Sequence, residues 1–224
     1  MHHGRVGRHR RDETEDEFRL LFVCTGNICR SPFAEILTRH LLRGRLGGRA
    51  AQAFSISSAG VQAVVGSAMH PDSRAQLEPW NLHGAHAEGF VARQLRSSMI
   101  EQAHLVLGAT PRHRSAVVAQ CSAALPITFS LREFARLAAA VDPGQLPAHP
   151  VARMHALVEL TRLQRGLVPV EPGAHDIPDP MGRPFEAHHD AAQLAYVALA
   201  SIVDIITASG APQTARTAPD TRRG

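Results

Sequence analysis

The sequence predicts an α/β fold with three layers, in which helices cover both faces of a four-stranded parallel sheet. Short apolar runs that suit buried strands alternate along the chain with segments whose apolar residues recur at helical spacing. Such strand–helix–strand connections are right-handed crossovers, so the strands they join run parallel. The 224 residues, 44% hydrophobic and 20% charged, are enough to bury one core. We expect a single domain over residues 18–208.

The two ends of the chain differ in composition from this domain. Residues 1–17 are rich in histidine, arginine and acidic side chains, and residues 209–224 are small, polar and rich in arginine and proline. Neither end offers apolar residues to bury, so both are expected to be flexible tails. The N-terminal stretch also lacks the apolar core of a signal peptide.

The first half of the domain predicts two strands, each followed by a helix. The first strand is expected over residues 19–23, and a helix follows it after a short loop. That helix ends in a glycine-rich stretch, 44–48. A second strand is expected over 54–57 and a second helix over about 71–77, closed near Pro79. The inward face of the first helix carries Phe33, Ile36, Leu37, His40 and Leu41.

The second half repeats this alternation. Ser97 or Ser98 is expected to cap a short helix ahead of a strand at 105–107. A helix over 111–120 opens with proline, which suits the first helical position. A fourth strand over 126–129 completes the sheet.

A helical insert is expected over about 131–172, ahead of the last helix. Its apolar spacing predicts one helix near 131–138 and another from 151 to about 166, with prolines between them. We expect a packed decoration of the surface that shapes the rim of the loop it leads into; a lid or a dimer contact is the alternative. Asp204 interrupts the apolar run of the last helix, so no segment is expected to span a bilayer. The apolar face of that helix carries Leu194, Val197, Ala198, Ser201, Ile202 and Ile205.

The composition narrows the class of function. The net charge is +4 and comes from arginine alone, because the chain has no lysine. With 4% aromatic residues and no arginine-rich helix, a nucleic-acid partner is not expected, and a basic cleft for an anionic ligand is the better account. Three cysteines do not make a secreted disulfide framework, so a reducing, cytoplasmic location is expected. The oligomeric state is left open.

The most informative motif is the loop after the first strand, Val23-Cys24-Thr25-Gly26-Asn27-Ile28-Cys29-Arg30-Ser31-Pro32. Gly26 and Asn27 are residues that let the backbone turn tightly. Ser31 suits an N-cap and Pro32 a first helical residue, so a helix should begin there. Its positive end then points into the loop, where backbone N–H groups can surround a tetrahedral oxyanion.

The two ends of this loop carry chemistry. Arg30 provides a planar fork that holds two phosphate oxygens at once. The helix terminus and Arg30 together favour the thiolate form of Cys24. A thiolate beneath a phosphate cradle is a nucleophile for phosphoryl transfer; a buried packing cysteine is the alternative.

A carboxylic acid is the second group that such chemistry needs. Cleavage of a phosphate ester requires an acid for the leaving oxygen and then a base for the attacking water. Asp176 and Asp179 lie in a loop stiffened by prolines, His175-Asp176-Ile177-Pro178-Asp179-Pro180. An Asp-Pro turn at the surface is the alternative.

Four motifs in order resemble the low-molecular-weight protein tyrosine phosphatases, which share a fold with one class of arsenate reductases. They are the Cys24–Pro32 loop, Ser58-Ala59-Gly60, Val91-Ala92-Arg93-Gln94-Leu95 and Asp176–Pro180. The resemblance implies hydrolysis of phosphotyrosine in a protein substrate through a cysteinyl-phosphate intermediate, with no cofactor and no metal. It makes Cys24 the nucleophile, Arg30 the phosphate-binding side chain and Asp179 the acid, with Asp176 structural. The substrate-binding donors are then Thr25, Gly26, Asn27, Ile28, Cys29 and Ser31.

One position departs from the family. Family members hold the counterpart of Asn27 through a network that includes the serine of the Ser-Ala-Gly motif and a histidine. Here that histidine position is occupied by Phe90, so the network around Asn27 and Ser58 must differ.

Other functions are kept as alternatives. An arsenate reductase of the same fold typically uses two further cysteines close together, whereas this chain has only Cys121 downstream. A catalytically weak phospho-binding module is disfavoured, because both Cys24 and Asp179 are present. The pairs His83/His86 and His188/His189 match no metal-binding signature and are expected to be solvated.

Overall fold

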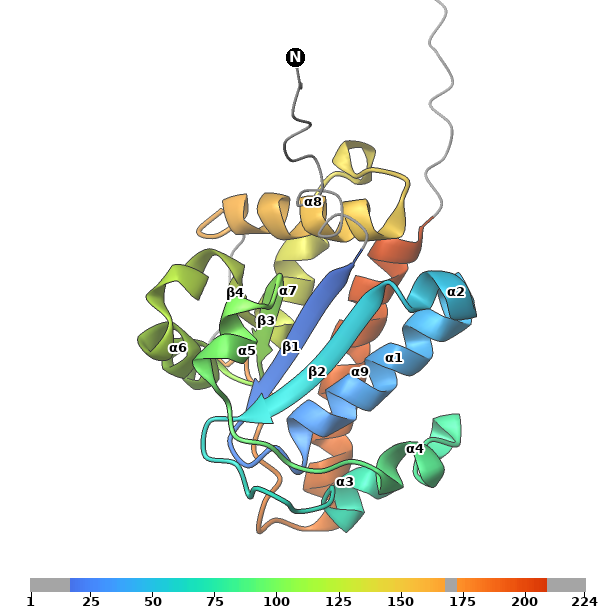
Figure 1. The fold of residues 1–224 in the computed structure, drawn as a ribbon, viewed down its shortest axis with the longest axis vertical. Coiled ribbons are helices and arrows are strands. Elements are labelled where there is room, and N and C mark those ends of the chain that lie inside the picture. Colours follow the sequence, from blue (N-terminus) through green and yellow to red (C-terminus); the bar gives the residue numbers. More distant parts are fainter. Residues whose placement is uncertain (1–16, 168–172, 209–224) are drawn as a thin grey trace, which may run out of the picture.

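The computed structural model describes residues 17–167 and 173–208. Both expected tails, apart from Glu17, and the end of the expected insert lie outside the described residues. The strands form one parallel sheet in the order β2-β1-β3-β4, which confirms the predicted fold (Figure 1). Their bounds are β1 Phe18–Cys24, β2 Phe54–Gly60, β3 Leu105–Gly108 and β4 Thr128–Ser130. Because the strands are parallel, their carboxyl ends share one edge of the sheet.

Helices cover both faces of the sheet. On one face α1 (Arg30–Leu46), α7 (Leu131–Ala138) and α9 (Phe185–Thr207) form the larger core cluster with Leu20 and Phe22 of β1. On the other face α5 (Ser97–Glu101) and α6 (Pro111–Gln120) pack with Leu21 and Val23. This alternation along β1 is the period-two pattern of a strand buried on both sides.

The remaining elements are short. Two single-turn helices, α3 (Pro71–Ala75) and α4 (Ala85–Glu88), lie near the carboxyl edge of the sheet (Figure 1). β4 begins later than predicted because Pro126 lies inside a 3₁₀ helix, η2 (Ser122–Ile127), and proline cannot donate to a strand ladder. The other short elements are α2 (Gly48–Ala51), η1 (Glu78–Trp80) and η3 (Pro143–Gln145).

Helix α8 (Pro150–Leu163) covers the opposite end of the sheet from Cys24 (Figure 1). The ring of its His155 packs against Phe18 at the start of β1, with 4.9 Å between ring centroids. Its buried Arg153 donates hydrogen bonds to three backbone carbonyls, those of Ile205, Leu146 and Pro147. This part of the expected insert is therefore packed into the domain.

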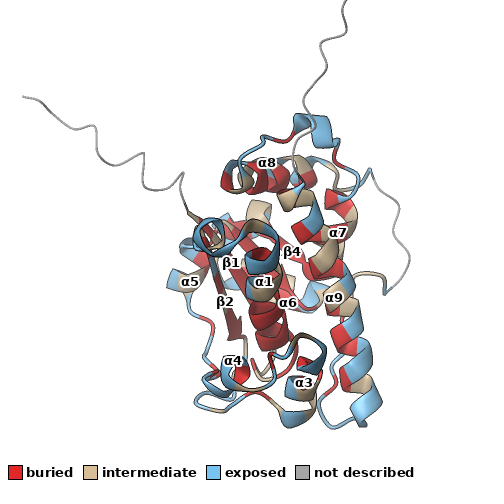
Figure 2. Cartoon of the chain, turned by 90° about the vertical axis from the view of Figure 1, so that its right-hand side faces the viewer, coloured by how far each residue is buried: buried red, intermediate tan, exposed pale blue. Residues whose placement is uncertain are grey.

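Helix α9 corrects one expectation. It is long and apolar enough to cross a bilayer by length and composition, with a mean hydropathy of 1.4 over the best window. Its inner face instead packs on α1 and α7, and Figure 2 shows buried residues on that side and exposed ones on the other. This two-sided burial is that of a core helix.

Candidate active site

The loop after β1 turns through Asn27, which has a φ of 54°. Asn27, not Gly26, adopts the left-handed conformation, and a side chain added at Gly26 would make ordinary contacts with Ile28 and Val64. Asparagine tolerates this conformation better than most residues. The turn directs the loop into α1.

The start of α1 corrects the prediction that Ser31 is the N-cap. The helix begins at Arg30 with Cys29 in the cap position, and no side chain caps its first turn. Ser31 lies within that turn, where its hydroxyl is 2.9 Å from the Cys24 Sγ and accepts a hydrogen bond from the Asn27 amide. The uncapped amides of α1 remain available to an anion.

The loop is held from β2 and from α1. Asn27 donates to the Ser58 hydroxyl at 2.8 Å and accepts from the Arg93 backbone N–H at 2.9 Å. Ser58 in turn donates to Glu35, which also pairs with the Arg93 guanidinium. Phe90 is buried in the larger core instead. In this chain the network around Asn27 includes Arg93, from a motif that the sequence singled out, and Glu35, which the sequence did not identify.

Gly60 lets β2 approach the loop closely. A Cβ atom on Gly60 would lie 2.4 Å from the Thr25 carbonyl oxygen. The backbone N–H groups of Val61 and Gln62 donate to the carbonyls of Cys24 and Thr25, both at 3.0 Å. These bonds turn the loop carbonyls outward, so that its N–H groups are free to face inward.

Asp179 is brought to this loop from the far end of the chain. Its loop is fixed by the Ile177 N–H, which donates to the Ala109 carbonyl after β3, and by Arg132 of α7, which donates to the Asp176 carbonyl. Arg30 donates to Asp179 Oδ2 at 2.5 Å and to the Ile177 carbonyl at 3.2 Å. The predicted acid and the predicted phosphate-binding arginine therefore lie in direct contact.

The Arg30 side chain keeps a hydrogen-bond donor available for an anion. Its side chain is buried, and its Nε has no hydrogen-bond partner within residues 17–167 and 173–208. A buried, unpaired donor on a charged group is costly unless a ligand completes it. A bound phosphate oxygen would satisfy this Nε.

His113 supports the loop from the start of α6, although no sequence pattern pointed to this residue. One ring nitrogen lies 3.0 Å from the Thr25 hydroxyl and the other 2.9 Å from the Thr110 hydroxyl. Burial, with Arg30 nearby, lowers the pKa of His113 to about 4. The imidazole is therefore neutral at pH 7 and acts as a positioning group for Thr25.

A cleft of about 720 Å³ opens over these groups, a volume typical of small-ligand sites. Cys24, at the end of β1 where the loop begins, is almost fully buried. Among the predicted catalytic residues, Arg30 and Asp179 line the cleft directly. Its wall also contains Thr25, Val61, Gln62, Thr110, Pro111, Arg112, His113, Asp176 and Pro178.

Known proteins resemble this chain in sequence. The family model described as low molecular weight phosphotyrosine protein phosphatase matches residues 19–142, which include Cys24 and Arg30 but not Asp179. A protein-arginine-phosphatase of Geobacillus stearothermophilus is 33% identical over 117 residues, 52% of this chain and 71% of that protein. The low molecular weight protein-tyrosine-phosphatase Etp of Escherichia coli K12 is 37% identical over 100 residues, 45% of this chain and 60% of Etp.

Solved structures resemble it in fold. The low molecular weight protein tyrosine phosphatase of T. tengcongensis superposes with a TM-score of 0.59 at 23% identity, covering 84% of this chain and 99% of that one. The YwlE arginine phosphatase of Geobacillus stearothermophilus gives a TM-score of 0.56 at 26% identity, covering 84% and 91%. Both solved structures cover 84% of this chain, which is more than the residues 19–142 that the family model matches. The shared fold therefore extends past residue 142.

Proposed function

We propose that this chain, which belongs to the low-molecular-weight protein tyrosine phosphatase family, hydrolyses phosphotyrosine in proteins with Cys24 as nucleophile. The protein is a phosphatase by its family, and its substrates are phosphorylated proteins. The observation that carries the residue assignment is the convergence of Cys24, Arg30 and Asp179 at one loop. We further propose a cytoplasmic location, because a thiolate nucleophile needs reducing surroundings.

The first step transfers the phosphoryl group to sulfur. The phosphate oxygens bind the loop N–H groups and the Arg30 guanidinium, and so compete with Asp179 for Arg30. The Cys24 thiolate attacks phosphorus and the bond from phosphorus to the tyrosine oxygen breaks. Asp179, once the phosphate has displaced it from Arg30, takes up a proton from solvent and donates it to that leaving oxygen.

The second step hydrolyses the cysteinyl-phosphate. Asp179 accepts a proton from a water molecule, whose oxygen attacks phosphorus. The phosphorus–sulfur bond breaks and the electron pair returns to Cys24. The Ser31 hydroxyl, 2.9 Å from this sulfur, is placed to donate a hydrogen bond to the departing thiolate.

The apolar rim of the cleft supports an aryl substrate. Ile28 and Val64 flank Gly26 in the loop, and Val61 and Pro178 line the cleft. The exposed Met181 follows the acid loop. Because Cys24 is almost fully buried, we expect the longer phenyl side chain to carry a phosphate to it more readily than a serine side chain does.

Phosphoarginine is the second candidate substrate. Relatives named as protein-arginine-phosphatases match this chain at 33% and 30% identity. The Asp176 carboxylate on the cleft wall could pair with a guanidinium. The apolar side chains of Val61 and Pro178 favour an aryl group over a guanidinium, and this places phosphoarginine second.

The test compares peptides that carry phosphotyrosine, phosphoarginine or phosphoserine, using the full chain. We expect the highest kcat/KM on phosphotyrosine, no turnover by Cys24→Ser, and unchanged turnover by the matched thiol control Cys121→Ser. Faster cleavage of phosphoarginine would transfer the assignment to that substrate. Equal rates on phosphotyrosine and phosphoserine would overturn tyrosine specificity and leave the Cys24 chemistry standing. Arsenate reduction with thioredoxin, without peptide turnover, would favour the arsenate reductase alternative.

A further inference from the structure

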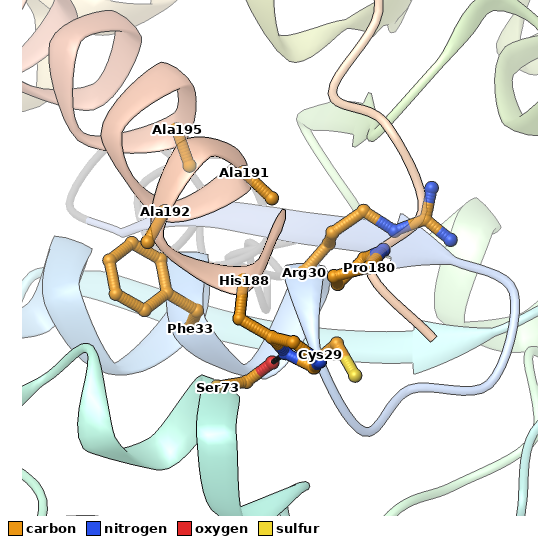
Figure 3. A pocket seen from close by; sticks show the side chains of 9 residues that line it. All are labelled: Cys29, Arg30, Phe33, Ser73, Pro180, His188, Ala191, Ala192 and Ala195. Atoms are coloured by element: carbon orange, nitrogen blue, oxygen red, sulfur yellow. Dashed lines mark hydrogen bonds between the residues drawn. The ribbon is translucent and has the colours of Figure 1, made fainter. Parts of the chain in front are cut away.

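Behind the phosphate loop, three metal-ligating side chains from separate elements converge. The Cys29 thiol, a ring nitrogen of His70 and a ring nitrogen of His188 all lie within 4.8 Å of one another. Cys29 caps α1, His70 caps α3 and His188 lies in the first turn of α9. Figure 3 shows the His188 ring beside the Cys29 thiol, in a pocket that Arg30 and Pro180 also line.

This arrangement contradicts the expectation that His188 is solvated. His188 is 2% exposed and Cys29 is 4% exposed. The His188 Nδ1 lies 2.8 Å from the Ser73 hydroxyl, which leaves Nε2 for another partner. The rings of His70 and His188 stack at 4.7 Å. Metal-binding histidines are commonly oriented in this way, with one ring nitrogen bonded to a neighbouring polar group.

We propose that Cys29, His70 and His188 form a zinc site, with water or the nearby Asp72 carboxylate as the fourth ligand. Asp72 Oδ2 lies 3.9 Å from the His188 Nε2. One thiolate and two imidazoles suit zinc and not magnesium or calcium, which select oxygen ligands. Zn–S and Zn–N bonds of about 2.3 and 2.0–2.1 Å place such donors roughly 3.3–3.6 Å apart. The ligand atoms must therefore approach by about 1 Å, and the half-buried His70 ring must turn out of its stack on His188 so that both nitrogens face the ion.

Zinc binding at this site exchanges water ligands of the ion for protein ligands and releases one proton. The Zn–S bond forms as the Cys29 thiol releases its proton to solvent, and the two imidazoles bind as neutral ligands. The bound ion ties the starts of α1, α3 and α9 together at the back of the phosphate loop. The protein should therefore be more resistant to unfolding with zinc than without it. Neither Cys24 nor any step of phosphate hydrolysis is needed for this site.

The test uses the full chain carrying Cys24→Ser, freed of metal, so that the reactive thiol cannot bind the probe. Titration with Co²⁺ should give one equivalent of a species with a thiolate-to-cobalt charge-transfer band, which Zn²⁺ then displaces. Cys29→Ser should abolish the band. Ser73→Ala, which removes the partner of His188, should weaken binding about 10–100-fold. Zn²⁺ should raise the Tm of the parent protein.

Matched controls separate the site from general metal binding. Cys121→Ser and His189→Ala, which change a distant thiol and the neighbouring histidine, should bind Co²⁺ as the parent does. His188 is buried and its replacement can disturb folding, so the half-buried His70→Ala serves as the second ligand variant. It should lose both tight binding and the rise in Tm. A saturable band that survives Cys29→Ser, or full binding by a folded His70→Ala, would overturn the proposal, as would no binding to the parent.

Discussion

At the scale of single residues, the site divides its work among side chains that differ in what they touch. Cys24 contacts Ser31, Arg30 holds Asp179 and the Ile177 carbonyl, and Asp179 reaches the cleft from a separate loop. The proposed nucleophile, phosphate binder and acid are thus separate groups. Their substitutions should give different kinetic signatures.

The catalytic roles predict a graded loss of activity. Cys24→Ser and Arg30→Ala should each abolish measurable turnover, because one removes the nucleophile and the other the phosphate fork. Asp179→Asn should slow substrates with poor leaving groups by about 10²–10⁴-fold and good leaving groups far less, since only the former need a proton. Steady-state kinetics on aryl phosphates of varied leaving-group acidity will test this. An equal effect on every leaving group would remove Asp179 from the role of acid.

Asn27 combines a backbone and a side-chain role, which two substitutions separate. Asn27→Ala and Asn27→Gly both lose the bonds to Ser31, Ser58 and Arg93. Only the alanine variant must also hold a φ of 54°, which costs an ordinary residue about 1–2 kcal/mol. Denaturant unfolding should therefore find Asn27→Ala less stable than Asn27→Gly by roughly 1 kcal/mol. Equal stabilities would show that the turn relaxes in the variants.

At the scale of elements, the two ends of the sheet serve different purposes. The carboxyl edge carries the loops of the site, whereas α8 covers the amino end through Arg153 and His155. Helix α7 contributes both to the site and to the core. Its Arg132 donates a hydrogen bond to the Asp176 backbone, and the helix packs on α9. Stability and catalysis should be separable along this axis.

Arg153 provides the test of that separation. Arg153→Ala leaves buried carbonyls without their charged donor and should destabilise the fold by about 3 kcal/mol with kcat/KM unchanged at permissive temperature. Arg162→Ala on the same helix is the matched control. It breaks only an exposed pair with Glu159 and should change stability by less than about 0.5 kcal/mol. A loss of activity in folded Arg153→Ala would connect α8 to the site.

At the scale of the whole molecule, the fold buries histidines in neutral form. Burial is the main cause that lowers the pKa of His104, His113, His175 and His188. An unfolded chain binds protons at these positions at higher pH than the folded protein does. These histidines therefore stabilise the fold fully at a pH above their unfolded pKa. Their contribution to the free energy of unfolding decreases as the pH falls from the unfolded pKa toward the lower folded pKa.

Among these histidines, His113 should have the largest effect on how stability depends on pH. Between its unfolded pKa near 6.5 and its folded pKa of about 4, only the unfolded state is protonated, so the free energy of unfolding decreases as pH falls. The loss from this residue should be about 2–3 kcal/mol at pH 4 relative to pH 7. His113→Gln, which keeps a polar partner for Thr25, should show a shallower decline in denaturant titrations across this range. An unchanged slope would mean that folding does not shift the pKa of His113.

Local sequence determined much of this protein. Alternating apolar segments predicted the parallel sheet, which the structure confirms. Cys24, Arg30 and Asp179 could be predicted as catalytic residues because short motifs carry them, and the structure brings Arg30 and Asp179 into contact. Tertiary structure decided the rest. Glu35 and Arg93 contact the network around Asn27, His113 supports Thr25, and Cys29 meets His188. These contacts join residues that lie far apart in the chain. Which residues meet depends on how the helices pack around the loop, and a local sequence pattern carries no information on that packing.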